Sequence, residues 1–235
     1  GYTAGGGAGG LQNVIDKWPF ASDTNATDVG NVTVARYGLT GSSSSTHGYS
    51  SGGDINNAGG NSNIIDKHSF AVDSNATDVG DLTITKRASA GHSSVTHGYN
   101  AGSRPTNNTI DKWPFASDTN ATDVGDLTLS RTYPAGQSST THGYSSGGNS
   151  GSYNDRIDKF TFATDADATD VGNLTVAKHV CGGNSSVTHG YTTSGSRSGI
   201  PHTDVIEKFT FATDADATDV GDLTVAKNAV AGTQK

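Results

Sequence analysis

The segment IDKFTFATDADATDVGNLTVAK, residues 157–178, decides the fold because the chain contains five copies of it. Within this segment Asp158 lies 12 residues before Asp170, and Asp170 lies 19 residues before His189 of a Thr-His-Gly-Tyr motif. Both intervals are constant wherever they occur. The distance from the Tyr of that motif to the acidic residue that opens the next copy instead measures 14, 17, 12, 14 and 16 residues. Fixed and elastic intervals together indicate a rigid repeated unit that carries one free loop. The acidic residues that open the copies are Asp16, Asp66, Asp111, Asp158 and Glu207.

Five units in 235 residues give a period of about 47, which is typical of propellers, solenoids and arrays. Each unit is too small to fold alone, so we expect one cooperative domain over residues 1–235. The chain has 32 Gly and no Met, a composition that suits short strands and tight turns. A hydrophobic content of only 31 % keeps disorder as an alternative. The aromatic and aliphatic residues recur at a fixed phase, which favours a folded protein.

Each unit contains four stretches with the pattern of short strands. They are Thr-His-Gly-Tyr, the alternating Ile-Asp-Lys-Phe-Thr-Phe-Ala of residues 157–163, Asn-Leu-Thr-Val-Ala-Lys of residues 173–178, and Ser-Ser-x-Thr-His. Between the second and third stretches, Asp-x-(Asn/Asp)-Ala-Thr-Asp favours an Asx turn. Four strands in one unit of this length predict a propeller blade.

The two ends of the chain predict how the ring closes. Gly1 and Tyr2 supply the second half of a Thr-His-Gly-Tyr motif, and residues 231–235 stop at the turn before one. We therefore expect an all-β, five-bladed β-propeller with four-stranded blades, closed by N- and C-terminal strands that share a blade. Because the chain begins within a motif and without Met, we also expect it to be part of a longer polypeptide.

The repeat resembles kelch-type propeller blades. The shared features are a glycine pair that closes a strand, an aromatic-centred strand after a loop, and a basic residue about ten positions before a His. The last strand lacks the Trp that is customary in kelch blades. The phrases IDKFxFAxDxNATDVGDLTVAR and SSxTHGYxxGG also resemble repeat arrays of marine bacteriophage structural proteins, over nearly the whole chain. That resemblance implies a virion-associated protein and no particular substrate.

Charge and composition argue against several classes of protein. A net charge of −8 disfavours nucleic-acid binding, which depends on Lys and Arg. No apolar run is long enough to span a membrane, and there is no signal peptide. The single cysteine, Cys181, cannot form a disulfide within the chain, and the other units lack an equivalent, so a nucleophilic role is disfavoured.

Two repeated polar patterns have a metal-binding alternative. The turn Asp23-x-Asn25-x-x-Asp28 resembles a calcium loop but lacks the distal Glu of an EF-hand, so we favour side chains that cap turn N–H groups. A ring of His side chains could line a channel metal site, but we favour His residues that bond a neighbouring blade. We therefore expect no metal and no cofactor. Because the candidate chemical residues repeat almost unchanged, we also expect no enzyme. The histidines concerned are His47, His97, His142 and His189.

The elastic loops are the variable part of the unit, and variable loops on a rigid scaffold are how recognition surfaces are built. Drift in unconstrained loops is the alternative. We expect a non-enzymatic recognition or display module of a virion that binds a host surface glycan or a neighbouring virion protein. A purely structural spacer or decoration protein of a phage particle is the second hypothesis. The predicted ligand-binding residues are Asn57, Asn63, Arg104, Asn107, Tyr153, Arg156, Arg197 and His202.

Overall fold

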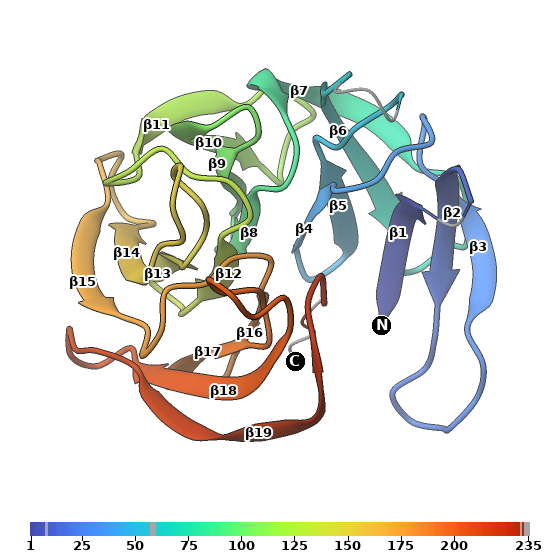
Figure 1. Ribbon diagram of the computed structural model, residues 1–235. Helices are drawn as coiled ribbons and strands as arrows, with labels where there is room; N and C mark the ends of the chain where they lie inside the picture. The colour runs from blue at the N-terminus through green and yellow to red at the C-terminus, as the bar shows by residue number, and fades with distance from the viewer. Residues whose placement is uncertain (8, 57–59, 231, 233–235) are drawn as a thin grey trace.

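The computed structural model describes residues 1–7, 9–56, 60–230 and 232. All regular secondary structure in these residues is β, in five antiparallel sheets arranged around an axis (Figure 1). The predicted five-bladed β-propeller is thereby confirmed. Each sheet pairs its strands in the order of the chain, so each blade is a simple meander.

The strands follow the repeat closely. Blade 1 contains β1 (Tyr2–Gly7), β2 (Leu11–Lys17) and β3 (Thr27–Asn31). Blade 2 contains β4 (Thr40–Ser43), β5 (His47–Ser51), β6 (Ser62–Ser69) and β7 (Thr77–Lys86). Blade 3 contains β8 (Ala90–Ser93), β9 (His97–Ser103), β10 (Asn107–Pro114) and β11 (Thr122–Asp126). Blade 4 contains β12 (Ala135–Ser138), β13 (His142–Ser146), β14 (Arg156–Thr161) and β15 (Thr169–Asn173). Blade 5 contains β16 (Gly182–Ser185), β17 (His189–Thr193), β18 (Thr203–Thr210) and β19 (Thr218–Lys227).

Two of the four predicted strands match the structure only in part. The strand predicted over residues 173–178 and its copies forms in blades 2 and 5, where β7 and β19 contain it, whereas in blade 4 the outer strand β15 ends at Asn173. The axial strand β16 begins three residues before the Ser-Ser-x-Thr-His stretch. Within that stretch the Ser186 hydroxyl accepts the N–H groups of Thr188 and His189, which makes it a turn instead of a strand.

Glycine in the Thr-His-Gly-Tyr motif is required by the strand register. Gly143 pairs with Phe160 on the neighbouring strand, and the Phe160 ring lies directly over it. A Cβ on Gly143 would come within 2.3 Å of that ring. The motif therefore leaves room for the aromatic residue of the Ile-Asp-Lys strand.

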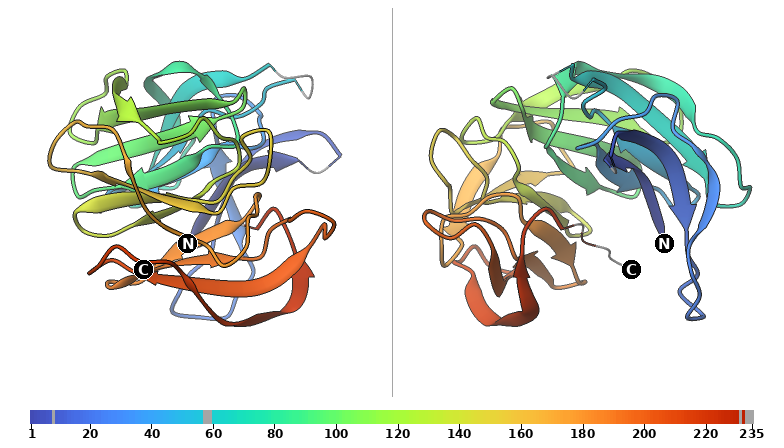
Figure 2. Two further views of the ribbon diagram at one scale, coloured as in Figure 1. Left: turned by 60° about the vertical axis from the view of Figure 1, so that its left-hand side comes forward. Right: turned by 45° about the vertical axis from the view of Figure 1, so that its right-hand side comes forward.

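Each hydrophobic cluster joins side chains of two neighbouring blades, and Figure 2 shows how the blades lie side by side. A typical cluster joins Tyr99, Ile110 and Leu127 of blade 3 to Phe160 and Ala168 of blade 4. Burial of these side chains is the main favourable term, so each blade depends on its neighbour for stability.

Around the axis, the blades meet backbone to backbone. The Ala88 N–H donates to the Gly38 carbonyl at 2.9 Å, and three later linkers continue the same chain of bonds. A Cβ on Gly91 would lie 2.3 Å from the Gly41 carbonyl oxygen of the preceding blade. The axial strands therefore pack through glycine. The later bonds run from Tyr133 to Ala88, from Val180 to Tyr133 and from Ala229 to Val180.

The shared blade is described only in part. Its sheet contains β1, β2 and β3, and the residues expected to complete it include 231 and 233–235, which lie outside the described residues.

Candidate functional site

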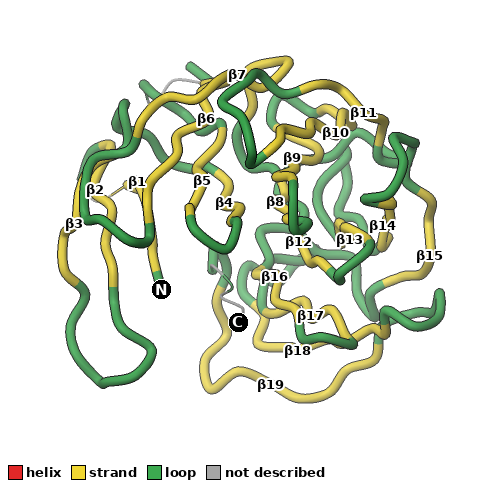
Figure 3. Tube along the Cα trace, turned by 180° about the vertical axis from the view of Figure 1, so that it is seen from behind, coloured by secondary structure: helices red, strands yellow, loops and turns green. Residues whose placement is uncertain are grey.

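The elastic loops connect the second and third strands of the blades, and they appear among the loop segments of Figure 3. In blades 2 to 5 each loop is tied by a β-bridge to the linker that enters the same blade. The loops therefore have a common anchor on the scaffold, although their sequences differ. The bridged pairs are Tyr37 with Asp54, Arg87 with Arg104, Thr132 with Asn149 and His179 with Ser196.

A cleft lies where the loops of blades 4 and 5 approach each other. It has a volume of about 440 Å³, within the range of small-molecule sites. Tyr153 lines it and stacks on His179, with ring centroids 4.6 Å apart and planes at 18°. Tyr133 packs edge-on against His179 at 6.0 Å. The cleft also carries amide, hydroxyl and backbone groups from Asn149, Gly151, Ser152, Ala177 and Ser198.

His179 is held in place and neutral. Its Nδ1 lies 3.4 Å from the Ser196 carbonyl, and burial lowers its pKa from the ordinary value although that contact opposes the shift. At neutral pH the His179 ring that stacks on Tyr153 is therefore uncharged. An aromatic surface with nearby amide and hydroxyl groups can pack against apolar faces while hydrogen-bonding their polar edges.

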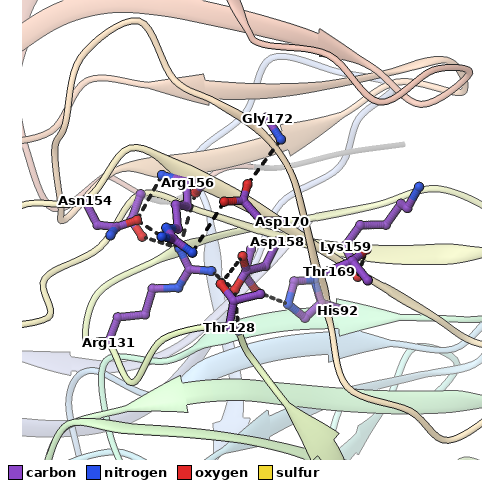
Figure 4. A network of polar contacts seen from close by, with 12 residues as sticks. His92, Thr128, Arg131, Asn154, Arg156, Asp158, Lys159, Thr169, Asp170 and Gly172 are labelled. Atoms are coloured by element: carbon purple, nitrogen blue, oxygen red, sulfur yellow. Dashed lines mark hydrogen bonds and ion pairs between the residues drawn. The ribbon is translucent and has the colours of Figure 1, made fainter.

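Arg156 lies in blade 4 but joins a different network (Figure 4). Its guanidinium is 3.4 Å from the Asp170 carboxylate, and its carbonyl accepts a hydrogen bond from Arg131. About two-fifths of the side chain is exposed, so it can still meet a ligand at the surface. Arg131 itself is fully buried and pairs with Asp158 beneath this point.

Two further predicted residues occupy the loop of blade 5. Arg197 is half-buried and lines a pocket with Lys178 and Glu207. The pocket holds only about 10 Å³, the space of one water molecule, so it admits no organic ligand. His202 is exposed in the same loop.

The remaining predicted residues do not gather at one point. Arg104 is exposed in blade 3, Asn63 is half-buried in β6, and Asn57 lies outside the described residues. Asn107 serves its own turn, because its side-chain oxygen accepts the Thr109 N–H at 2.7 Å. Of the predicted ligand-binding residues, the cleft therefore contains Tyr153.

Sequence reasoning missed the residue that follows the basic residue of each unit. In blade 2 the buried Asp54 accepts from Arg87 and lies 3.3 Å from the Tyr37 hydroxyl. In the linker that enters blade 5, His179 occupies this position and supports the cleft residue Tyr153 by stacking on its ring. The sequence does contain a signal for this position, because the residue after the basic residue differs from unit to unit. These residues are Tyr37, Arg87, Thr132, His179 and Asn228.

The Asx-like turns are fully used by the scaffold. The Asp28 side chain accepts the Gly30 N–H at 3.1 Å, and Asn75 accepts the Asn31 N–H of the preceding blade at 3.0 Å. Asp73 pairs with Lys17 of that blade. The capping interpretation is therefore supported, with the addition that the capped groups belong partly to the neighbouring blade. Within the described ranges, no cluster of three or more His, Cys, Asp or Glu residues could hold a metal ion.

The repeated histidines bond locally. His142 Nδ1 lies 2.8 Å from the hydroxyl of Thr141, its own neighbour, and its ring packs against Tyr144. The expectation of a bond to another blade is therefore wrong, because the preceding Thr is closer. Burial of the sulfur raises the pKa of the half-buried Cys181 to about 12, so the thiol stays protonated.

No protein-family model matches the chain, and comparison with curated proteins finds no significant match. The part of the chain that the structure describes contains no helix suited to crossing a membrane.

Proposed function

We propose that this chain is a non-enzymatic recognition module of a virus particle and that its loop face binds a neutral glycan of a host surface. The particle assignment is supported by the resemblance of the repeat phrases to phage structural arrays. The kelch-like arrangement of glycines, aromatic strand and basic residue supports a scaffold that displays loops. Glycan binding is supported by one structural observation, the Tyr153 ring that lines the cleft between blades 4 and 5 and stacks on His179.

The chemistry of the cleft fits a sugar. A pyranose has an apolar face of C–H groups, which packs on an aromatic ring, and a polar edge of hydroxyls. The Asn149 side chain and the hydroxyls of Ser152 and Ser198 can hydrogen-bond such an edge. The net charge of −8 disfavours anionic sugars. Because the loops have equivalent anchors, several weak contacts on one particle would add avidity.

A glycan array tests the proposal. We expect selective retention of neutral glycans, reduced at least about tenfold by Tyr153→Ala because the stacking surface is lost. Val95→Ala is the matched control, since Val95 is exposed in a turn outside the elastic loops and its change should leave retention intact. If no glycan is retained, or if Tyr153→Ala and Val95→Ala reduce retention equally, the proposal is overturned.

The second candidate is a structural spacer or decoration protein. The observation that favours it is the set of buried ion pairs between blades, exemplified by Arg36 with Asp66, in which repeated charged residues stabilise the junctions and leave no charge free for a ligand. In that case the array is silent and the chain co-purifies with capsid or tail proteins.

A further inference from the structure

The four junctions between successive blades use the same contacts. The basic residue that ends one unit pairs with the buried acid of the next, as in Lys86 with Asp111 at 3.0 Å. A second ion pair lies nearer the surface, as in Lys67 with Asp118. A Tyr stacks on a Phe of the next blade with centroids 4.7–5.0 Å apart, as in Tyr49 on Phe115.

The apolar part of each junction is equally regular. One blade inserts an aliphatic residue that is only 2–3 % exposed, and the next covers it with an alanine, joined in three of the four junctions by an aromatic side chain. The aliphatic residues are Val32, Leu82, Leu127 and Leu174.

Blade 5 presents the first half of this junction without the covering side chains among the described residues. Leu223 is only half-buried, and Val225 is 64 % exposed, whereas its copies Val34 and Ile84 are 38 % and 41 % exposed. Lys227 occupies the position of the buried Lys178 but is exposed. Neither Lys227 nor Lys208 has an ion-pair partner among the described residues.

Blade 1 presents the second half, equally uncovered. Phe20, the counterpart of the Phe that receives the Tyr, is 75 % exposed. Trp18 is half-buried, whereas its counterpart Trp113 is 1 % exposed. In the described part of the chain Asp16 and Asp23, which match the acids of the two ion-pair rows, also lack cationic partners. Two lysines on one edge thus face outward, as do two aspartates on the other.

The uncovered edge of blade 5 and the uncovered edge of blade 1 lie at different positions around the axis. Ala229 bonds Val180, and a Cβ on Gly232 would meet the Gly183 carbonyl, so Ala229 and Gly232 lie at the axial position that follows blade 5. A Cβ on Gly41 would meet nothing within 4 Å, although its counterparts meet the preceding axial strand. The described sheet of blade 1 also has no axial strand beside β1. Figures 1 and 2 show β19 and the β1–β3 sheet on either side of this seam.

We propose that the seam between β19 and the β1–β3 sheet is an acceptor site for one further blade of the same repeat, donated by another polypeptide. Such a blade would place its acid on Lys227 and its own basic residue on Asp16. It would cover Leu223 and Val225 on one side and bring Trp18 and Phe20 into a core on the other. A whole second copy cannot donate this blade, because its second blade would then overlap the first blade of the acceptor. This inference is independent of the proposed glycan site.

The probe is a synthetic peptide of residues 140–188, added to the intact chain. It carries the second, third and fourth strands of one repeat and the axial strand of the next, and it contains no Trp. Trp113 is already buried, so a blue shift and reduced iodide quenching report on Trp18. We expect saturable binding to a monomeric chain with both spectral changes, and no change with a scrambled peptide.

A charge exchange supplies the specific control. Lys227→Asp in the chain should weaken peptide binding at least about tenfold, because it opposes Asp158 of the peptide. Asp158→Lys in the peptide should restore binding to that variant only. Glycan retention should be unaffected, which separates this inference from the proposed function.

Two results would overturn the inference. One is absence of binding at saturating peptide. The other is a Trp18 that is already protected in the free chain, with Lys227→Asp rescued by Asp16→Lys in the same monomer, which would show that blades 5 and 1 close on each other. If the peptide stays unfolded in solution, residues 140–188 appended after Lys235 give a second measurement. The appended chain should melt higher than the parent and protect Trp18, and an unchanged melting temperature counts against the acceptor site.

Discussion

The Lys178 ammonium lies 2.6 Å from the carboxylate of Glu207, although the two residues belong to different blades. Both side chains are almost fully buried, and Thr175 donates to the same carboxylate from its hydroxyl and its N–H. At the equivalent place in other junctions the pair is Arg with Asp or Lys with Asp. The position of the charges is thus constant while the side chains that carry them change.

Breaking this pair on one side should be costly. Lys178→Met leaves Glu207 buried without a cation, and such a loss costs about 3–5 kcal/mol of unfolding free energy. Chemical denaturation of the purified chain measures it.

The chain contains its own control for this change. Lys227 is the same residue of the next unit but is exposed, so Lys227→Met should change stability by no more than about 0.5 kcal/mol. Equal effects of the two substitutions would contradict the assignment of Lys178 to a buried pair.

Much of the fold could be predicted because the same spacing and hydrophobic pattern occur in five copies of the unit. The elastic loop, the Ile-Asp-Lys strand and the propeller class follow from spacing alone. The predicted outer strand forms in blades 2 and 5 as part of β7 and β19 but ends earlier in the other blades, although Leu82 and Leu174 are equally buried. The repeated local pattern does not contain this difference between blades.

The candidate site was harder to predict than the fold. Tyr153 was found because it lies in a variable loop, but His179 lies in the linker to the next blade and supports Tyr153 only when two blades are side by side. The open seam could not be predicted either. Lys227 and Asp16 have the same sequence context as their buried counterparts, and only their exposure distinguishes them.

The glycine contact at the axis predicts a sharp difference between two alanine substitutions. A Cβ at Gly136 would lie 2.4 Å from the Gly91 carbonyl oxygen, and backbone there cannot move cheaply, so Gly136→Ala should cost about 1–3 kcal/mol. Gly41→Ala meets nothing and should be neutral or slightly stabilising. Thermal melts of both variants check this. A similar loss in Gly41→Ala would show that its side of the axis is occupied in solution.

A strained linker predicts a stabilising change. Val180 has φ of 57°, a left-handed conformation that is unfavourable for a β-branched residue, and the first linker places Gly38 at the same position. Val180→Gly should raise stability by about 0.5–1 kcal/mol, because relief of strain exceeds the added entropy of the unfolded chain. Differential scanning calorimetry measures the shift. Val95→Gly, at an exposed turn position without positive φ, should give no gain, and a gain there would remove strain as the explanation.

His92 predicts how stability depends on pH. Its ring is buried between blades, with Nδ1 3.1 Å from the Gln137 carbonyl and Nε2 3.1 Å from the Ser145 hydroxyl, and burial lowers its pKa to about 4. The unfolded chain has the ordinary pKa of about 6.5, so between these values it binds more protons than the folded chain. Stability should therefore fall as pH drops through this window, by about 2 kcal/mol from this residue at about pH 5.

His92→Gln installs the residue that blade 4 carries at Gln137 and should remove that part of the loss. Urea denaturation of both proteins at about pH 7.5 and about pH 5 tests the difference. Val95→Ala, at an exposed residue that does not titrate, should keep the parental pH dependence. Parallel losses in the parent and His92→Gln would show that other groups cause the acid sensitivity.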